Sequence, residues 1–190
     1  MNKNLQVFKY VIFDFIAAAI AWSLFFIYRK YAIDPDIFSH LNEQVFSDNN
    51  FYLGITLIPV FWLILYVLVG TYRKIYRKSR LKELGQTLLI TLIGVTIIFF
   101  ALILDDVIVS YRSYYQSFLA LFGLHFFFTY TFRLILTSST VRKIHKKIIG
   151  FNTLLVGSNG NALSIYHDIE NQVKSSGNKF IGFLNVYDYD

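Results

Sequence analysis

Hydrophobic positions along the chain gather into four long runs separated by shorter polar segments. The runs cover residues 11–28, 51–70, 84–104 and 114–136. A helix needs about 20 mostly apolar residues to cross the hydrocarbon core of a bilayer. The second and third runs contain no charged residue at all. The pattern therefore predicts a four-span transmembrane domain within residues 1–140.

The pattern changes after Lys147, where shorter periodic segments replace the long runs. Residues 151–157 predict a short buried strand that ends in a glycine turn. Residues 161–174 repeat apolar side chains, Val173 among them, at helical spacing and predict an amphipathic helix. Residues 180–186 predict a second strand. A strand–helix–strand order is the opening of a Rossmann-like sheet. The predicted fold is a membrane all-α four-helix bundle followed by the start of a Rossmann-like α/β domain over residues 148–190.

The first run could instead be a cleaved signal peptide, because Lys3 and Lys9 precede it. However, the only Ala-x-Ala pattern, Ala19 to Ala21, falls inside the apolar run, and the bulky Trp22 follows it. This arrangement favours a retained membrane span.

Lysine and arginine are distributed unevenly between the polar segments. They concentrate before the first run, between the second and third, and after the fourth, whereas Arg29, Lys30 and Arg112 lie in the alternate loops. Cytoplasmic loops carry the excess of positive charge in membrane proteins. The distribution predicts that both termini are cytoplasmic. The net charge of +6 thus reflects topology and argues against nucleic acid as a partner.

Composition supports the membrane interpretation and limits the chemistry. The chain is 55% hydrophobic and 19% aromatic, and its mean hydropathy is +0.48. It contains no cysteine, which excludes disulfides and cysteine-based zinc sites. The four histidines are scattered without metal-ligand spacing, and no nucleophile motif is present. We therefore assign no catalytic or metal-binding residue.

Two charged residues lie within the apolar runs, Asp14 in the first and Arg133 in the fourth. Asp14 shares a helical face with Ala18 and Ala21, whose small side chains favour close helix packing. Arg133 continues a polar stripe that begins at His125. We predict that Asp14 and Arg133 pair, so that reversing both charges should restore folding lost in either single variant. The alternative is that each residue reaches the membrane interface separately.

The loop after the second run is strongly basic. Its bases alternate with apolar and aromatic residues, as in a helix that lies in the membrane interface. Such a segment would face anionic lipid, and a polyprenyl phosphate headgroup is a further candidate ligand. The simpler interpretation is that the bases only set the orientation of the neighbouring spans in the membrane. The bases are Arg73, Lys74, Arg77, Lys78, Arg80 and Lys82.

The glycine turn partly matches a dinucleotide-binding fingerprint. Gly157 and Ala162 occupy the first and third positions of G-x-G-x-x-G/A, and Gly160 lies between them. Asn159 replaces the middle glycine, which normally lets the backbone approach a pyrophosphate. The second strand also ends near Asn185 rather than at an acid that could bind a ribose. A folding unit without ligand is therefore favoured, with a nucleotide at this turn as the alternative.

Two stretches carry a resemblance to a known family. They are GTYRKIYRKSRLKELGQTLL between the second and third runs and KIIGFNTLLVGSNGNALSIYHDI at the start of the tail, which is followed by FIGFLNV. With the four runs, they make the chain resemble the N-terminal region of bacterial polyprenyl-phosphate sugar-1-phosphate transferases. This family, which includes undecaprenyl-phosphate glucose and galactose phosphotransferases, initiates exopolysaccharide and O-antigen synthesis.

The resemblance implies a membrane anchor and accessory or regulatory region in the bacterial inner membrane. The family's catalytic domain, with a Mg²⁺-dependent acidic dyad, lies C-terminal to the residues present here, so we expect no cofactor and no turnover in this segment. The implied partners are the lipid bilayer, undecaprenyl phosphate and polysaccharide-assembly proteins, and a homo-oligomer is left open.

Two alternatives remain at the level of the sequence. Membrane-bound nucleotide-sugar dehydratases begin with a similar four-span and Rossmann-like arrangement. A non-enzymatic membrane scaffold for polysaccharide assembly would also fit. The reading frame past Asp190 would discriminate between these interpretations.

Overall fold

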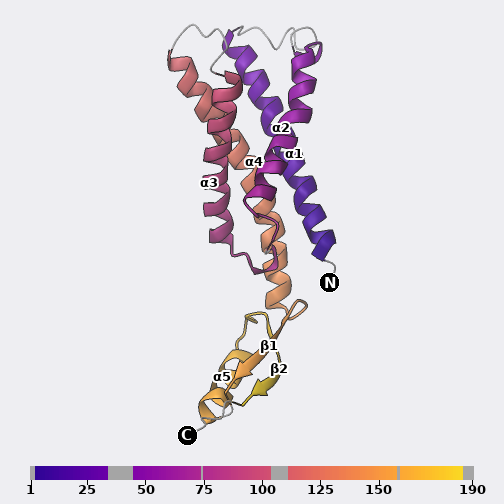
Figure 1. The fold of residues 1–190 in the computed structure, drawn as a ribbon, viewed down its shortest axis with the longest axis vertical. Helices are drawn as coiled ribbons and strands as arrows, with labels where there is room; N and C mark the ends of the chain where they lie inside the picture. The colour runs from indigo at the N-terminus through magenta and orange to yellow at the C-terminus, as the bar shows by residue number, and fades with distance from the viewer. Residues whose placement is uncertain (1–2, 34–44, 74, 104–110, 158, 186–190) are drawn as a thin grey trace. The chain divides into compact units, whose positions relative to one another are not determined.

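The structure is a computed structural model that describes residues 3–33, 45–73, 75–103, 111–157 and 159–185 (Figure 1). The chain divides into two compact units, one of residues 2–137 and one of residues 138–190. Each unit is described by itself.

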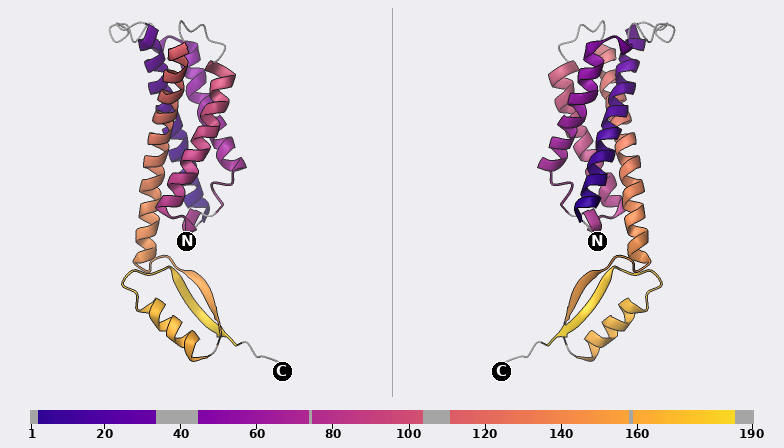
Figure 2. Two further views of the ribbon diagram at one scale, coloured as in Figure 1. Left: turned by 90° about the vertical axis from the view of Figure 1, so that its left-hand side faces the viewer. Right: turned by 90° about the vertical axis from the view of Figure 1, so that its right-hand side faces the viewer.

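The first unit is built from long helices. Figure 2 shows them running side by side as a bundle. Each of the four predicted spans falls on a helix, and all four helices are long and apolar enough to cross a membrane, which makes the chain a multi-pass membrane protein. The elements are α1 (Lys3–Ile33), α2 (Asn49–Leu68), the short 3₁₀ helix η3 (Ile75–Arg77), α3 (Arg80–Ile98), the π-helical turn η4 (Phe99–Ile103) and α4 (Tyr111–His145), which continues into the second unit.

Local signals in the sequence set the helix ends. Asp48 caps α2 by accepting a hydrogen bond from the Asn50 backbone N–H at 3.0 Å, and Ser79 caps α3 in the same way, at 3.2 Å from the Lys82 backbone nitrogen. After α2, Gly70 adopts a φ of 72°, a left-handed conformation that glycine reaches without strain. This turn directs the chain into a loop of residues 69–79.

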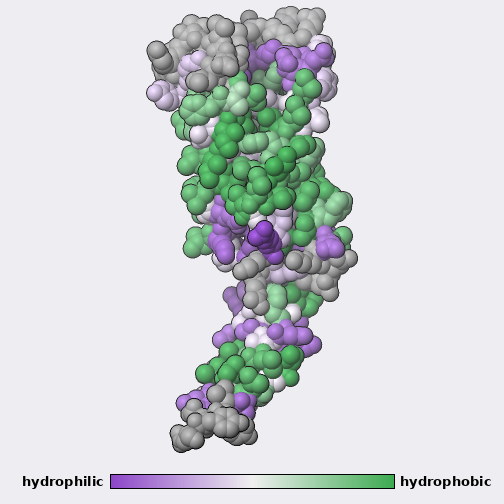
Figure 3. Space-filling view, viewed as in Figure 1, coloured by the Kyte–Doolittle hydropathy of each residue, from purple (hydrophilic) through white to green (hydrophobic). Residues whose placement is uncertain are grey.

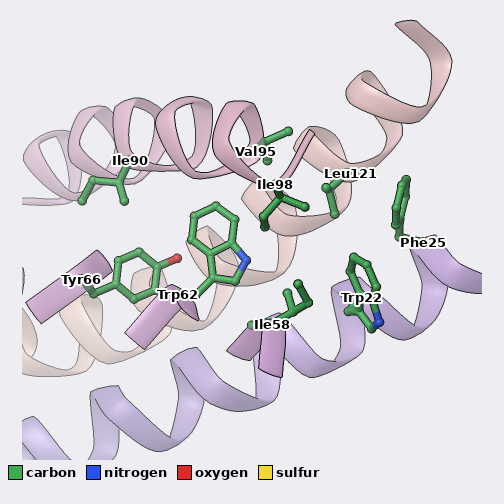
Figure 4. Close-up of a cluster of buried hydrophobic side chains, with 10 residues drawn as sticks. Trp22, Phe25, Ile58, Trp62, Tyr66, Ile90, Val95, Ile98 and Leu121 are labelled. Atoms are coloured by element: carbon green, nitrogen blue, oxygen red, sulfur yellow. The ribbon is translucent and has the colours of Figure 1, made fainter. Parts of the chain in front are cut away.

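The apolar core of the bundle is centred on Trp62 of α2 (Figure 4). Gly94 of α3 lies directly against the Trp62 ring, and Gly54 of α2 lies directly against Trp22 of α1. Neither glycine leaves room for a Cβ atom, so these small residues let the helices approach closely, as is typical of membrane bundles. Large apolar side chains on the outside of the helices remain exposed, and Figure 3 shows them as a hydrophobic band on the face displayed.

The second unit contains a small parallel sheet. Strands β1 (Phe151–Val156) and β2 (Asn178–Leu184) pair in parallel, with an irregularity between Thr153 and Leu154, and α5 (Gly160–Glu170) connects them. This is the predicted strand–helix–strand order. Two strands and one helix do not establish a larger Rossmann-like sheet, which stays a prediction.

One boundary in this unit differs from the sequence prediction. The helix predicted to reach Lys174 ends at Glu170, with Asn171 as its C-cap. Val173, which the periodicity placed on the apolar face of the helix, lies beyond the cap and is fully exposed. The apolar spacing in the sequence continues past Asn171, whereas the helix ends at Glu170.

Candidate functional site: a buried ionic network

Asp14 of α1 and Arg133 of α4 form a two-pronged ion pair inside the bundle. Arg133 Nε donates to Asp14 Oδ1 and Arg133 Nη2 donates to Asp14 Oδ2, each at 2.8 Å. The side chains are 1% and 0% exposed, respectively. The structure thus brings together the two residues that were predicted to pair. Parallel N–H···O bonds of this kind are among the stronger hydrogen bonds in proteins and fix the relative orientation of the groups.

The loop of residues 69–79 contributes a third member to this pair. Tyr72 donates its hydroxyl hydrogen to Asp14 Oδ2 at 2.8 Å. Burial and the negative charge of Asp14 both raise the pKa of Tyr72, so the hydroxyl keeps its proton and acts as a donor. The contact attaches the loop to α1 and gives the carboxylate another hydrogen bond.

A second acid lies on the other side of Arg133. Arg133 Nη1 is 3.6 Å from Glu83 Oε1 and 3.4 Å from the hydroxyl oxygen of Thr87, both on α3. Lys78 Nζ lies 3.0 Å from Glu83 Oε2 and 3.2 Å from its Oε1. Asp14, Glu83, Arg133 and Lys78 therefore form a buried network of two acids and two bases with no net charge.

The position of Lys78 corrects the interpretation of the basic loop. Lys78 was expected to face lipid with the other five bases, but it is 7% exposed and ion-paired with Glu83. Burial lowers the pKa of Lys78, while the charge of Glu83 opposes that effect. Because the loop folds back toward the bundle, Lys78 belongs to the network and not to a lipid-facing surface.

The other loop bases differ from Lys78. Arg73, Arg80 and Lys82 are exposed, as the lipid-facing interpretation requires. Lys74 and the side chain of Arg77 lie outside the part of the chain that the structure describes. Lipid binding by this surface stays a prediction.

A second polar branch runs along α4 from Arg133 to His125. His125 Nε2 lies 2.9 Å from the hydroxyl of Tyr66 and 3.3 Å from that of Thr129. The imidazole stacks on Trp62 with 3.6 Å between ring centroids. The Arg133 guanidinium lies over the Tyr66 ring, 4.1 Å from its centroid, a cation–π arrangement. The polar stripe predicted on the fourth span therefore faces the interior and links α4 to α2.

Several members of the network were not identified from the sequence. Glu83, Tyr72 and Tyr66 join it although only Asp14 and Arg133 were singled out as a polar pair. One signal was present: Glu83 is the only acid among residues 49–104, and six bases lie within ten residues before it. An isolated acid beside several bases is a candidate for an ion pair. The tyrosines carried no such signal, since aromatic residues are common at membrane interfaces.

The glycine turn of the second unit is arranged around its own helix cap. Gly157 has a φ of 123°, and Gly160 begins α5. Asn159 Oδ1 accepts a hydrogen bond from the Ala162 backbone N–H at 3.1 Å. A phosphate bound at the helix N-terminus would accept a hydrogen bond from this amide, but the amide already donates to the Asn159 side chain. The geometry fits the ligand-free interpretation better, and nucleotide binding at these residues stays a prediction.

No protein-family model, curated protein or solved structure matches the chain. The resemblance to sugar-1-phosphate transferases is therefore an expectation that depends on the two sequence stretches alone.

Proposed function

We propose that residues 1–140 are the membrane anchor, and residues 148–190 an accessory or regulatory unit, of a sugar-1-phosphate transferase that initiates exopolysaccharide or O-antigen synthesis on undecaprenyl phosphate. The observation that carries the anchor role is the buried ionic network. Its charges are paired with one another, because Asp14 is bound by Arg133 and Tyr72 and Glu83 by Lys78. Glu83 Oε2 has the ion-pair contact with Lys78 but no hydrogen bond.

Ionisable groups inside a membrane usually serve either chemistry and transport or the packing of a bundle. Groups used in transport or catalysis must be reachable by an ion, a proton or a substrate. Here Asp14, Glu83 and Arg133 are at most 1% exposed and hold one another in fixed geometry. This arrangement supports an anchoring role for the bundle. Helix α4 supplies the covalent continuation of that anchor, since it extends to His145, shortly before β1 begins at Phe151.

The proposed location is the bacterial inner membrane with both termini in the cytoplasm. Because the chain lacks cysteine, single cysteines can report this topology. In intact cells, we expect Ser47→Cys to react with a membrane-impermeant maleimide and Arg73→Cys to react only after permeabilisation. Thr71→Cys is the matched control for burial, because Thr71 is 1% exposed, and should stay unreactive until denaturation. Labelling of Arg73→Cys in intact cells would contradict the orientation.

The role of this segment is tested by an assay for sugar-phosphate transfer. Membranes that contain the chain are supplied with undecaprenyl phosphate, Mg²⁺ and a panel of radiolabelled nucleotide sugars. We expect no lipid-linked sugar phosphate above that of membranes without the chain. Transfer by this segment would overturn the accessory role. Sequencing the reading frame beyond codon 190 tests the family: a transferase domain is the expected result, and a dehydratase domain or a stop codon would overturn it.

A further inference from the structure

The bases of the second unit gather at one end of its sheet. Residues 138–190 contain six bases, and all six lie at or next to the end where both parallel strands begin (Figure 1). Two lie in the last turn of α4, two in the turn before β1, one in the loop before β2 and one at the start of β2. They are Arg142, Lys143, Lys146, Lys147, Lys174 and Lys179. Residues 142–150 and 171–179 are called the basic end of this unit.

Contacts within the unit join the two segments of the basic end. Gly177 has a φ of 87°, and a Cβ atom at this position would be 2.8 Å from Ile144 Cγ2 of α4, so the loop before β2 packs directly on the last turn of α4. The Gly177 carbonyl accepts a hydrogen bond from the Phe151 backbone N–H at 2.7 Å. Lys147 and Lys179 line the same hollow between the segments. The six bases therefore belong to one continuous surface.

The positive charge of this surface is not balanced by the acids of the unit. Lys147 Nζ binds Glu170 Oε2 at 3.0 Å. The other five bases are exposed, and within the described part of the chain none of them has an ion-pair partner. Asp168 is the other acid of α5, while Asp188 and Asp190 lie outside the described residues. Even with all four acids counted against them, the six bases leave an excess of two positive charges.

Large apolar side chains are exposed among these bases. Ile148, in the turn before β1, is 70% exposed, and Val173, in the loop before β2, is fully exposed. Bases interspersed with exposed apolar side chains are typical of segments that lie at a membrane interface. There the apolar groups enter the headgroup region and the bases contact anionic lipid. Neither Ile148 nor Val173 contributes to the core of its own unit, so a membrane interface would give both a favourable environment.

The basic end also follows a membrane span directly in the chain. Helix α4 is long and apolar enough to cross a membrane, and Arg142 is the first charged residue after Arg133. Charged residues that follow a span lie among the lipid headgroups. Lys146 and Ile148 come four and six residues after Arg142, which is little more than one helical turn of about 5.4 Å. This separation is within the Debye length of about 8–10 Å over which an anionic surface attracts bases.

We propose that the basic end of the second unit lies on the anionic lipid surface of the membrane that α4 spans. Ile148 and Val173 enter the headgroup region, and Lys146, Lys174 and Lys179 lie beside lipid phosphates. The exposed apolar side chains among the bases favour a lipid surface over a nucleic acid, which offers no apolar layer. This contact holds the unit against the membrane, and it does not depend on which enzyme the chain belongs to.

A fluorescent probe on a single cysteine tests the contact, because the chain lacks cysteine. The full chain is reconstituted in vesicles of phosphatidylcholine, with or without phosphatidylglycerol, that contain a small fraction of lipid with a quencher in the headgroup. Val173→Cys carries the probe at the basic end. Leu163→Cys is the matched control, because Leu163 is 52% exposed in the first turn of α5, at the opposite end of the strands. We expect quenching at position 173, only with phosphatidylglycerol, and none at position 163.

Charge variants in the Val173→Cys background test the role of the bases. Each base near an anionic surface strengthens binding by about fivefold, so Lys146→Gln with Lys174→Gln should lower the ratio of lipid-bound to free probe by roughly 25-fold. Arg80→Gln with Lys82→Gln removes two exposed bases of the first unit and should leave the quenching unchanged. Equal quenching at positions 163 and 173, or quenching at position 173 without phosphatidylglycerol, would overturn the proposal.

Amide hydrogen exchange of the unaltered chain provides a measurement that needs neither probe nor substitution. We expect the amides of residues 171–177 to exchange more slowly in vesicles with phosphatidylglycerol than in phosphatidylcholine alone. Equal exchange in the two kinds of vesicle would contradict the lipid contact. Stronger protection of these residues by added RNA or by an acidic polypeptide than by phosphatidylglycerol would assign the surface to another class of partner, and would overturn the proposal as well.

Discussion

Replacing either Asp14 or Arg133 alone by an apolar residue of similar size is expected to lower the free energy of unfolding by about 3–5 kcal/mol, because the remaining charge is left buried without its partner. The pair is at most 1% exposed and joined by two 2.8 Å hydrogen bonds. The double variant Asp14→Leu with Arg133→Met should recover most of the loss, since Glu83 keeps Lys78 as its counter-ion. The free energies of unfolding of the two single variants and the double variant can be measured and compared in mixed micelles.

The neighbours of Arg133 change the outcome expected for charge reversal. An aspartate at position 133 would lie near Glu83, which is 3.6 Å from the present guanidinium. The variant Asp14→Arg with Arg133→Asp should therefore have a free energy of unfolding well below that of the wild type. If the pair had no other charged neighbours, exchanging its charges would restore the wild-type stability.

Lys30→Gln is the control for these substitutions, because the ion pair of Lys30 with Asp48 is partly exposed and such pairs contribute less than about 1 kcal/mol. Losses that simply add in the double apolar variant would contradict the pairing.

Substituting Gly94 by leucine is expected to destabilise the bundle by about 1–3 kcal/mol, the range observed when side chains are forced into filled cores. A Cβ atom at Gly94 would collide with the six-membered ring of Trp62, and Trp62 is itself 0% exposed and stacked on His125. The ring is therefore enclosed, and moving it would disturb its stack on His125. The same micelle unfolding measurement detects the loss.

Gly123 of α4 offers a matched control, because nothing lies within 4 Å of the position that its Cβ would occupy. Gly123→Leu places the same side chain on a membrane helix without a collision, and its effect should stay within about 0.5 kcal/mol. Leucine has a higher helix propensity than glycine, so similar losses in Gly94→Leu and Gly123→Leu would show that the collision with Trp62 does not determine the result.

The helices and the central ion pair could be predicted because their signals are local. A run of about 20 apolar residues has few outcomes other than a membrane helix, and a charge in such a run requires a partner. Asp14 and Arg133 were the two charges that met this condition, and the structure places them in contact.

The rest of the network depended on how the loop of residues 69–79 folds. Lys78 has five basic neighbours in sequence, and nothing local distinguishes the one that is buried. The burial of Lys78 accompanies the contacts of Tyr72 with Asp14 and of Glu83 with Arg133. These contacts join residues that are far apart in the sequence, so no local pattern reveals them. The same limit applies to Asn159, which stands where a binding glycine was sought and instead caps its own helix.

The separation of 119 residues between Asp14 and Arg133 has a consequence for biogenesis. Membrane helices are made in order from the N-terminus, so Asp14 enters the translocon long before α4 has been synthesised. Asp14 lies near one end of the apolar run 11–28, so it should oppose insertion by less than the about 2.5–3.5 kcal/mol that a carboxylate costs at the centre of a helix. Integration of α1 should therefore be less favourable until α4 has been made, when Arg133 supplies the partner of Asp14.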